Sequence, residues 1–239
     1  MSGKRTLWGI GVGPGDPELV TMKGSRVLGS VRHVIAPVAR IKSESLALSI
    51  AKPHLRPDAT VHEREFPMIR SRQERTARWE EAASLALGIL AKGEDVAFPT
   101  LGDPSLYSTW IYFARSVRDL DADVTISVIP GIPSFCAAAA ATGEVLAEEE
   151  QILTIVPASA DDTEAVRRAL QAGPAVLMKV GDRAAALHDL LREMDRDARA
   201  VLATRVGLPG EEFRRGAEIA QVPSKGAYLS LILAGKDSA

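Results

Sequence analysis

Short apolar runs alternate with longer amphipathic stretches along the N-terminal half of the chain. Four runs rich in apolar and β-branched residues predict strands, at 6–12, 31–38, 95–101 and 124–131. Five stretches with helical spacing of apolar residues or a high alanine content predict helices, at 16–30, 43–53, 71–93, 105–120 and from Ser134 onward. Strands that alternate with helices indicate a mostly parallel sheet with helices on both faces.

The first expected helix, residues 16–30, begins with a pair of residues that is common at helix N-termini. Asp16 is expected to be its N-cap and Pro17 its first helical residue. One side of this helix is expected to be apolar and to face the sheet. That side is formed by Leu19, Met22, Val27 and Leu28.

The same alternation starts again near residue 145. Strands are expected at 151–157 and 175–181, and helices at 161–173 and 182–194. Three further runs are expected to form consecutive strands of an antiparallel meander, at 199–207, 217–223 and 228–235. We therefore expect an α/β fold made of two α/β domains, residues 1–130 and 131–239, with a ligand-binding cleft between them.

Composition and charge exclude several classes of protein. The chain has 239 residues, 46% of them hydrophobic, and a formal net charge of −2, so it lacks an overall basic field for nucleic acid or an anionic membrane. No signal peptide and no membrane-spanning apolar run is visible, so we expect a cytoplasmic protein. Cys136 is the only cysteine, which excludes an intrachain disulfide, and the four histidines lack metal-ligand spacing. We expect no metal site.

The segment GVGPGDPE, residues 11–18, has some features of a dinucleotide-binding loop. That fingerprint, G-x-G-x-x-G, requires a third glycine at the position that Asp16 occupies here. The Asp16 carboxylate would compete with a pyrophosphate for the same helix N-terminus. The loop is therefore expected to bind a different ligand, and a nicotinamide-dependent oxidoreductase is disfavoured.

Two other loops share the composition of this one. GDPSL at 102–106 repeats GDPEL at 15–19, and PGIPS at 130–134 follows the next expected strand. In each loop a glycine lets the backbone approach a ligand and a proline helps to start a helix. An efficient strand-to-helix turn would explain any one of them, but their recurrence favours a ligand site.

These loops, together with VLMK at 176–179 and YLSLIL at 228–233, follow the order of motifs in the tetrapyrrole methylase family, which the chain resembles over nearly its whole length. The resemblance implies two α/β domains, S-adenosylmethionine as the methyl donor and a homodimer. The strings GDPSLYST and PGIPSFCAAA are most similar to the branch of the family that methylates precorrin-2 at its C(20) meso carbon, on the route to cobalamin.

The resemblance also implies roles for individual residues. Asp16, in the first loop, would face the tetrapyrrole substrate, whereas Pro133 stands where a small polar residue is commoner in the family. No residue is identified as a catalytic base. The residues implied in cofactor binding are Pro14, Leu101, Gly102, Asp103, Leu106, Ser108, Thr109, Pro133, Ser134, Met178 and Gly207.

A tetrapyrrole substrate is rich in carboxylates, and residues 64–78 contain five arginines that could pair with them through two parallel hydrogen bonds. A solvated helix face would explain any single arginine, but Arg70 and Arg72 flank the expected helix start and are the expected substrate contacts.

Three alternatives remain open. They are a methylase for another tetrapyrrole carbon or for cobalt-factor II, a non-catalytic S-adenosylmethionine sensor, and the disfavoured oxidoreductase.

Overall fold

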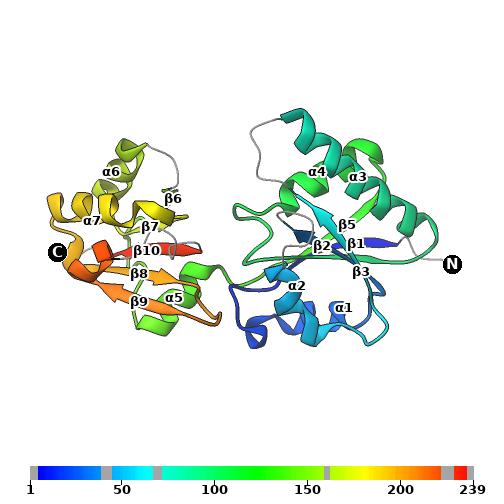
Figure 1. Ribbon diagram of the computed structural model, residues 1–239, viewed down its shortest axis with the longest axis horizontal. Helices are drawn as coiled ribbons and strands as arrows, with labels where there is room; N and C mark the ends of the chain where they lie inside the picture. Colours follow the sequence, from blue (N-terminus) through cyan, green and yellow to red (C-terminus); the bar gives the residue numbers. More distant parts are fainter. Residues whose placement is uncertain (1–4, 39–44, 67–71, 159–161, 222–228, 236–239) are drawn as a thin grey trace. The chain divides into compact units, whose positions relative to one another are not determined.

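The computed structural model describes residues 5–38, 45–66, 72–158, 162–221 and 229–235. The chain divides into two compact units, Met1–Pro133 and Ser134–Ala239. Each unit has its own sheet with helices packed against it (Figure 1). The expected α/β architecture is therefore confirmed for each unit. Within the described part of the chain, no helix is both long and apolar enough to cross a membrane.

A five-stranded sheet with the order β3-β2-β4-β1-β5 forms the centre of the first unit. All four neighbouring pairs are parallel, as expected. Its strands are β1 (Thr6–Gly11), β2 (His33–Val38), β3 (Thr60–Glu65), β4 (Val96–Thr100) and β5 (Thr125–Ile129). Strand β3 was not predicted, because this edge strand reads TVHERE and is only partly buried, so it lacks the apolar run of an inner strand.

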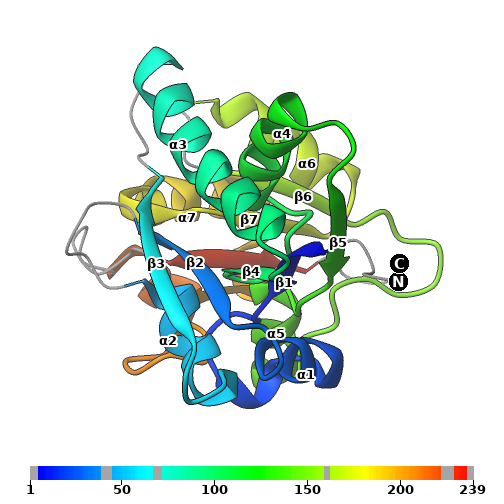
Figure 2. The same ribbon diagram turned by 90° about the vertical axis from the view of Figure 1, so that its right-hand side faces the viewer.

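Helices cover both faces of this sheet (Figure 2). They are α1 (Met22–Leu28), α2 (Leu46–Ala51), α3 (Arg72–Ala91) and α4 (Trp110–Leu120). Phe98 of β4 lies in the core beneath α3 and α4, where its ring stacks on Phe113 with centroids 4.7 Å apart. Ile10 and Ile129 lie in a second cluster, beneath α1 and α2. Burial on both faces explains why the inner strands read as nearly continuous apolar runs.

The stretch 16–30 is not the single helix that its pattern predicts. Asp16 caps only a short 3₁₀ turn, η1 (Pro17–Leu19), and α1 begins afresh behind a second N-cap, Thr21. Met22, expected on the apolar side, is 91% exposed. The extended backbone of Thr21 interrupts the helical phase, so the buried side of α1 consists of Gly24, Val27 and Leu28.

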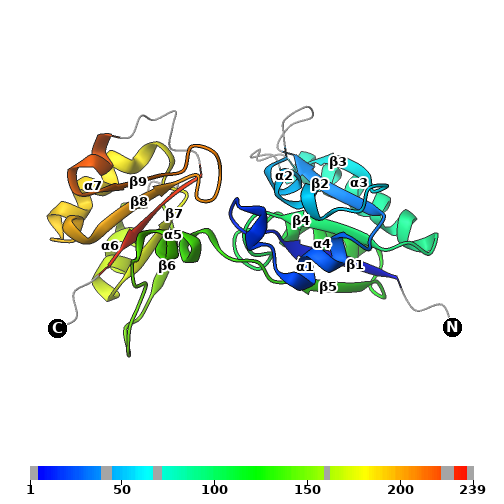
Figure 3. The same cartoon turned by 90° about the horizontal axis from the view of Figure 1, so that it is seen from below.

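The second unit contains a mixed sheet with the order β6-β7-β10-β8-β9. Its strands are β6 (Thr154–Pro157), β7 (Ala175–Met178), β8 (Ala200–Thr204), β9 (Glu212–Arg215) and β10 (Ser230–Ala234). Its helices are α5 (Ser134–Thr142), α6 (Thr163–Ala172) and α7 (Ala184–Glu193), and the main core lies between the sheet and the pair α6 and α7 (Figure 3).

The expected meander at the end of the chain is wrong in two respects. Residues 217–221, the described part of the run 217–223, are not a strand, because Gly216–Gln221 form a 3₁₀ helix, η5, that buries Ile219 against the core below α7. In addition, β10 inserts between β7 and β8 and is antiparallel to both. Strands β7 and β8 therefore point the same way, and their carboxyl ends lie at one edge of the sheet.

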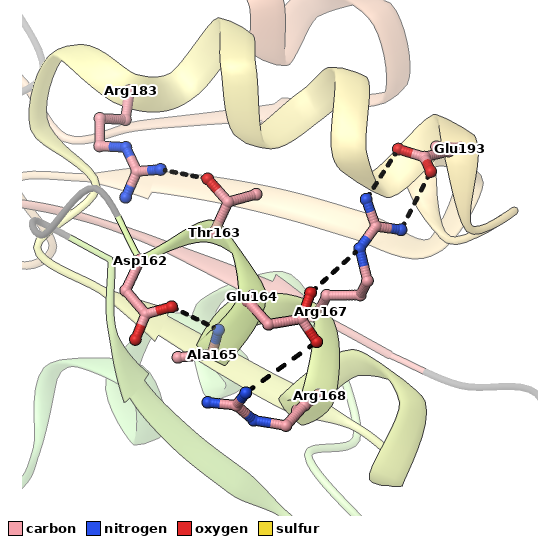
Figure 4. Close-up of polar contacts among 8 residues, drawn as sticks. All are labelled: Asp162, Thr163, Glu164, Ala165, Arg167, Arg168, Arg183 and Glu193. Atoms are coloured by element: carbon pink, nitrogen blue, oxygen red, sulfur yellow. Dashed lines mark hydrogen bonds and ion pairs between the residues drawn. The ribbon is translucent and has the colours of Figure 1, made fainter.

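Polar contacts connect α6 to its surroundings (Figure 4). Asp162 caps the helix by accepting a hydrogen bond from the Ala165 N–H at 3.0 Å. Arg167 donates two hydrogen bonds, of 3.0 and 3.1 Å, to the Glu193 carboxylate of α7, and these hold the pKa of Glu193 below its ordinary value. Arg183 donates to the Thr163 hydroxyl at 3.2 Å, so the start of α6 is also attached to the segment before α7.

Candidate functional site

Three loops emerge side by side at the carboxyl edge of the first sheet, because β4, β1 and β5 are parallel neighbours. The loops after β1 and β4 are joined by their backbones. The Gly102 N–H donates to the Gly13 carbonyl at 2.7 Å, and the Gly13 N–H donates back at 3.4 Å. The repeated GDP segments thus form one connected backbone surface.

Glycine is required where these loops cross. A Cβ added to Gly11 would lie 2.5 Å from the Gly131 nitrogen, and one added to Gly131 would overlap the Gly102 carbonyl oxygen. Gly102 itself has φ +68°, in the left-handed region that favours glycine. The three loops therefore approach more closely than any side chain would allow. Gly102 was among the predicted site residues, but the structural need for glycine at Gly11 and Gly131 was not predicted.

Asp103 connects the loop after β4 to the loop after β5. One carboxylate oxygen accepts a hydrogen bond from the Gly131 N–H at 3.0 Å, and the other accepts from the Ser105 N–H at 2.8 Å and from the Ser105 hydroxyl. Partial burial by itself would raise the pKa of Asp103, but the hydrogen bonds from Ser105 and Gly131 outweigh it and hold the pKa below its ordinary value. Asp103 is therefore ionised at neutral pH.

The end of the second loop is shaped by internal hydrogen bonds. The buried Ser108 hydroxyl lies 2.7 Å from the Thr100 hydroxyl and accepts a hydrogen bond from the Trp110 N–H at 3.1 Å. Helix α4 starts at Trp110 rather than at 105, because Tyr107 takes a left-handed φ of 51° and the chain is still turning there. Ser108 thus fixes the start of α4, and the neighbouring implied residues Leu101, Leu106 and Thr109 are partly exposed.

Asp16 lies in the first loop, where its carboxylate accepts a hydrogen bond from the Glu18 N–H at 2.8 Å. The turn that it begins is held from outside by His54, whose ring nitrogens lie 2.9 Å from the Pro17 carbonyl oxygen and 3.0 Å from the Ser25 hydroxyl. Pro14 precedes Asp16 in this loop and is buried.

The structure describes the side chain of neither arginine expected to bind substrate. Arg70 lies outside the described residues, and Arg72 is the first residue of α3. Their role therefore stays a prediction.

The remaining implied cofactor residues occupy defined positions in their own units. Pro133 closes the loop after β5 in the first unit, and Ser134 begins α5. Met178 ends β7, and Gly207, with φ +72°, follows β8, so both lie at the same edge of the second sheet.

Backbone strain is concentrated at this edge of the second sheet. Lys179, Arg205 and Leu229 have φ values of 58°, 53° and 61°, although none of them is glycine. Left-handed non-glycine residues cluster at functional sites in many proteins. The sequence gives no signal for this strain, except that Lys179 directly follows Met178.

The charge of the three loops limits the kinds of ligand that they can bind. Residues 11–18, 101–109 and 130–134 contain no lysine or arginine, and they carry Asp16, Glu18 and Asp103. A phosphate would find no cation there, whereas a cationic ligand with hydroxyl and amino groups would find carboxylates and backbone groups. Among the residues that the structure describes, no group of three or more His, Cys, Asp or Glu side chains could hold a metal ion.

Comparison with known proteins gives a consistent result. The family model of the tetrapyrrole (corrin/porphyrin) methylases matches residues 6–220. The chain is 34% identical to the cobalt-precorrin-2 C(20)-methyltransferase of Salmonella typhimurium over 99% of this chain and 98% of that protein. It is 28% identical to the precorrin-2 C(20)-methyltransferase of a Sinorhizobium species over 95% of this chain and 94% of that protein.

Solved structures share the fold. Cobalt precorrin-4 methyltransferase aligns with a TM-score of 0.69 at 21% identity, covering 98% of this chain and 96% of that one. Uroporphyrin-III C-methyl transferase from Thermus thermophilus, complexed with S-adenyl homocysteine, aligns with a TM-score of 0.64 at 21% identity, covering 97% of both chains. From the family match and the full-length similarity, the chain belongs to the tetrapyrrole (corrin/porphyrin) methylases.

Proposed function

We propose that this protein is an S-adenosylmethionine-dependent methyltransferase that methylates the C(20) meso carbon of precorrin-2, giving precorrin-3A in cobalamin biosynthesis. The observation that carries the proposal is the 34% identity, over nearly the full length of both chains, to an enzyme named for methylation at C(20). The relative from Sinorhizobium is named for the same carbon.

The loops of the first unit fit S-adenosylmethionine by their chemistry. The ligand is cationic at sulfur and has no phosphate, and the three loops hold carboxylates without a single basic side chain. Gly102 leaves open space where a Cβ would project, so the backbone can approach a ligand closely there. The cofactor would contact Leu101, Gly102 and Asp103, and the resemblance to the family implies the same role for Met178 and Gly207.

The bound cofactor would supply a methyl group activated by a positively charged sulfur. The residues of this chain would mainly align the reacting groups and exclude water, because the electron-rich tetrapyrrole is its own nucleophile. Alignment of this kind can lower the free-energy barrier of the reaction by about 7–11 kcal/mol. The carboxylate of Asp103, held by Ser105 and Gly131, is preorganised for such a role, since its position is set before the ligand arrives.

We further propose that the substrate is metal-free precorrin-2 and that the protein acts as a homodimer. A cobalt ion in the substrate could be coordinated by a histidine of the protein, but three of the four histidines already have partners. A ring nitrogen of His33 lies 3.1 Å from one of His62, and the ring nitrogens of His54 contact the Pro17 carbonyl and the Ser25 hydroxyl. His188 is buried in the second unit. An axial water could replace a histidine, so the relative named for cobalt-precorrin-2 keeps cobalt-factor II as the competing substrate.

Calorimetry and a methylation assay test the proposal. The protein is expected to bind one S-adenosylmethionine per chain, to ignore NAD and ATP, and to form methylated product from precorrin-2. Binding without product would identify a sensor, and tight nucleotide binding without S-adenosylmethionine binding would contradict the proposal entirely. A paired anaerobic measurement of kcat/KM for precorrin-2 and cobalt-factor II determines whether the substrate carries cobalt. A preference for the cobalt form would contradict the proposed metal-free substrate but would leave the methyltransferase assignment intact.

A further inference from the structure

The connection between α5 and β6, residues 143–153, extends away from the second sheet (Figure 3). Its tip is acidic and has a defined turn. The Gln151 N–H donates to the Glu148 carbonyl at 3.0 Å, and the Glu148 N–H donates to the Gln151 side-chain oxygen at 3.2 Å. Glu149 sits in this turn with φ 48°. Glu149 and Glu150 are both exposed, so a shaped turn presents two carboxylates to the outside.

The same connection exposes apolar side chains while its base is anchored. Val145 is 66% exposed and Ile152 is 67% exposed, on either side of the acidic tip. Arg215 of β9 forms an ion pair with Glu144 and donates to the Thr142 carbonyl at 3.3 Å. The anchored segment therefore leaves two large aliphatic side chains exposed to solvent, one on each side of the acidic tip.

The first unit contains a hollow whose apolar and basic lining complements the aliphatic and acidic side chains of this connection. It has a volume of about 400 Å³ and lies beside α4 and the edge strand β5. Trp110, Ile111, Ala114 and Val128 give it apolar walls, and Val128 is 46% exposed. The volume far exceeds the roughly 10–15 Å³ that one water molecule needs on the same measure, so the hollow has room for side chains.

Two arginines give this hollow its charge. Arg115 and Arg118 lie one turn apart on α4 and are both exposed. Within the described part of the chain neither guanidinium has a carboxylate partner, and Asp119 is the one acidic residue in the lining. Exposed unpaired arginines beside apolar walls match a segment that carries carboxylates between aliphatic side chains.

We propose that this hollow receives the 143–153 segment of a second copy of the chain, and that the contact is reciprocal. The Arg115 and Arg118 guanidiniums pair with Glu149 and Glu150 of the second copy, and Val145 and Ile152 cover the apolar walls. Two such contacts related by a two-fold axis close a dimer. The inference rests on the proposed homodimer and assigns its surfaces.

The proposed contact also touches the candidate site. Pro104 and Ser105 line the hollow, and Ser105 donates two hydrogen bonds to the Asp103 carboxylate. A second copy seated in the hollow therefore packs against the loop that positions Asp103.

A charge-exchange experiment tests the proposal by sedimentation velocity. In a dimer of the Arg115→Glu/Arg118→Glu variant, glutamates would face glutamates. In a dimer of the Glu149→Arg/Glu150→Arg variant, arginines would face arginines. Because like charges repel, each variant alone is expected to raise the dimer dissociation constant at least about tenfold. Mixed in equal amounts, the two variants form a heterodimer in which both contacts are complementary, and dimerisation is expected to return. A Lys23→Glu/Arg26→Glu variant on α1 makes the same charge change elsewhere and is expected to stay dimeric.

The outcomes separate two failures. If both variants remain dimeric, or if mixing them fails to restore the dimer while circular dichroism shows both folded, the assignment of these surfaces is wrong. If the wild-type protein is a monomer at all accessible concentrations, the homodimer itself is wrong. Calorimetric binding of S-adenosylmethionine by the wild type is measured alongside, because it tests the proposed methyltransferase independently of assembly.

Discussion

The Asp103 carboxylate accepts a hydrogen bond from the Gly131 N–H at 3.0 Å, although 28 positions separate the two residues along the chain. This bond attaches the loop after β4 to the loop after β5, while Gly13 and Gly102 attach the loop after β1. The three loops are thereby held as one surface at the carboxyl edge of the sheet, where open α/β sheets bind their ligands.

Replacing Asp103 by asparagine is expected to weaken S-adenosylmethionine binding by about tenfold or more, because the ionised carboxylate is lost. It should also lower the free energy of unfolding by about 1–2 kcal/mol at neutral pH. The folded pKa of Asp103 lies below its ordinary value, so its stabilisation is present above about pH 4 and is lost as the pH falls through the folded pKa. The difference between wild type and variant should therefore shrink in acid.

Calorimetry and denaturant titrations at several pH values measure both effects. Asp162→Asn is the matched control. Asp162 caps α6 through the Ala165 N–H, and asparagine is an equally good N-cap, so stability should change by less than about 1 kcal/mol and cofactor affinity should not change. Unchanged affinity in Asp103→Asn would remove this residue from the proposed cofactor site.

Gly131→Ala is expected to destabilise the protein by more than about 2 kcal/mol and to abolish cofactor binding, because the new Cβ overlaps the Gly102 carbonyl and forces the loops apart. Gly88→Ala is the control. A Cβ at Gly88 in α3 meets nothing within 4 Å, so alanine there should stabilise the helix by about 0.5–1 kcal/mol. Thermal unfolding compares the two, and equal melting temperatures would contradict the close approach of the loops.

The His33 and His62 rings lie with nitrogens 3.1 Å apart on β2 and β3. Burial, followed by the positive charges of His33 and Arg64, lowers the pKa of His62. The unfolded chain therefore binds a proton near pH 6.5 that the folded protein binds only at lower pH, and stability should fall as the pH drops below about 6.5. His62→Gln is expected to flatten this dependence in urea titrations, and an unaltered slope would count against the histidine pair.

Arg196 donates hydrogen bonds to four backbone carbonyls, those of Leu170, Gly173, Ala234 and Gly235, at 2.7–3.2 Å. It thereby connects the end of α6 to the end of β10. Arg196→Lys keeps the charge but loses the planar set of donors, and it is expected to cost about 2–3 kcal/mol of stability. Arg192→Lys on the exposed side of α7 should be neutral, and equal urea midpoints for both variants would refute the role.

Replacing Arg70 and Arg72 together by alanine is expected to raise the apparent dissociation constant for the tetrapyrrole and to leave that for S-adenosylmethionine unchanged, because guanidinium groups pair with substrate carboxylates. Arg168→Ala, an exposed arginine of α6, serves as control. Equal loss of both affinities would indicate misfolding rather than lost substrate contacts.

The sequence by itself determined four of the five strands of the first sheet and the three glycine- and proline-containing loops. Parallel strands buried on both faces are apolar runs, and tight turns need glycine and proline. Through Asp16 the sequence also disfavoured a pyrophosphate in the first loop. It could not find β3, whose partly exposed edge position permits a polar sequence.

Only the tertiary structure decided where the chain's distant segments meet. The insertion of β10 between β7 and β8 is a long-range pairing, and the helical form of Gly216–Gln221 follows from packing that overrides its alternating pattern. The bond from Gly131 to Asp103 and the backbone overlap that excludes a side chain at Gly131 likewise have no local signal. Periodicity reports which face of an element is buried, but the atoms that an element contacts depend on the whole fold.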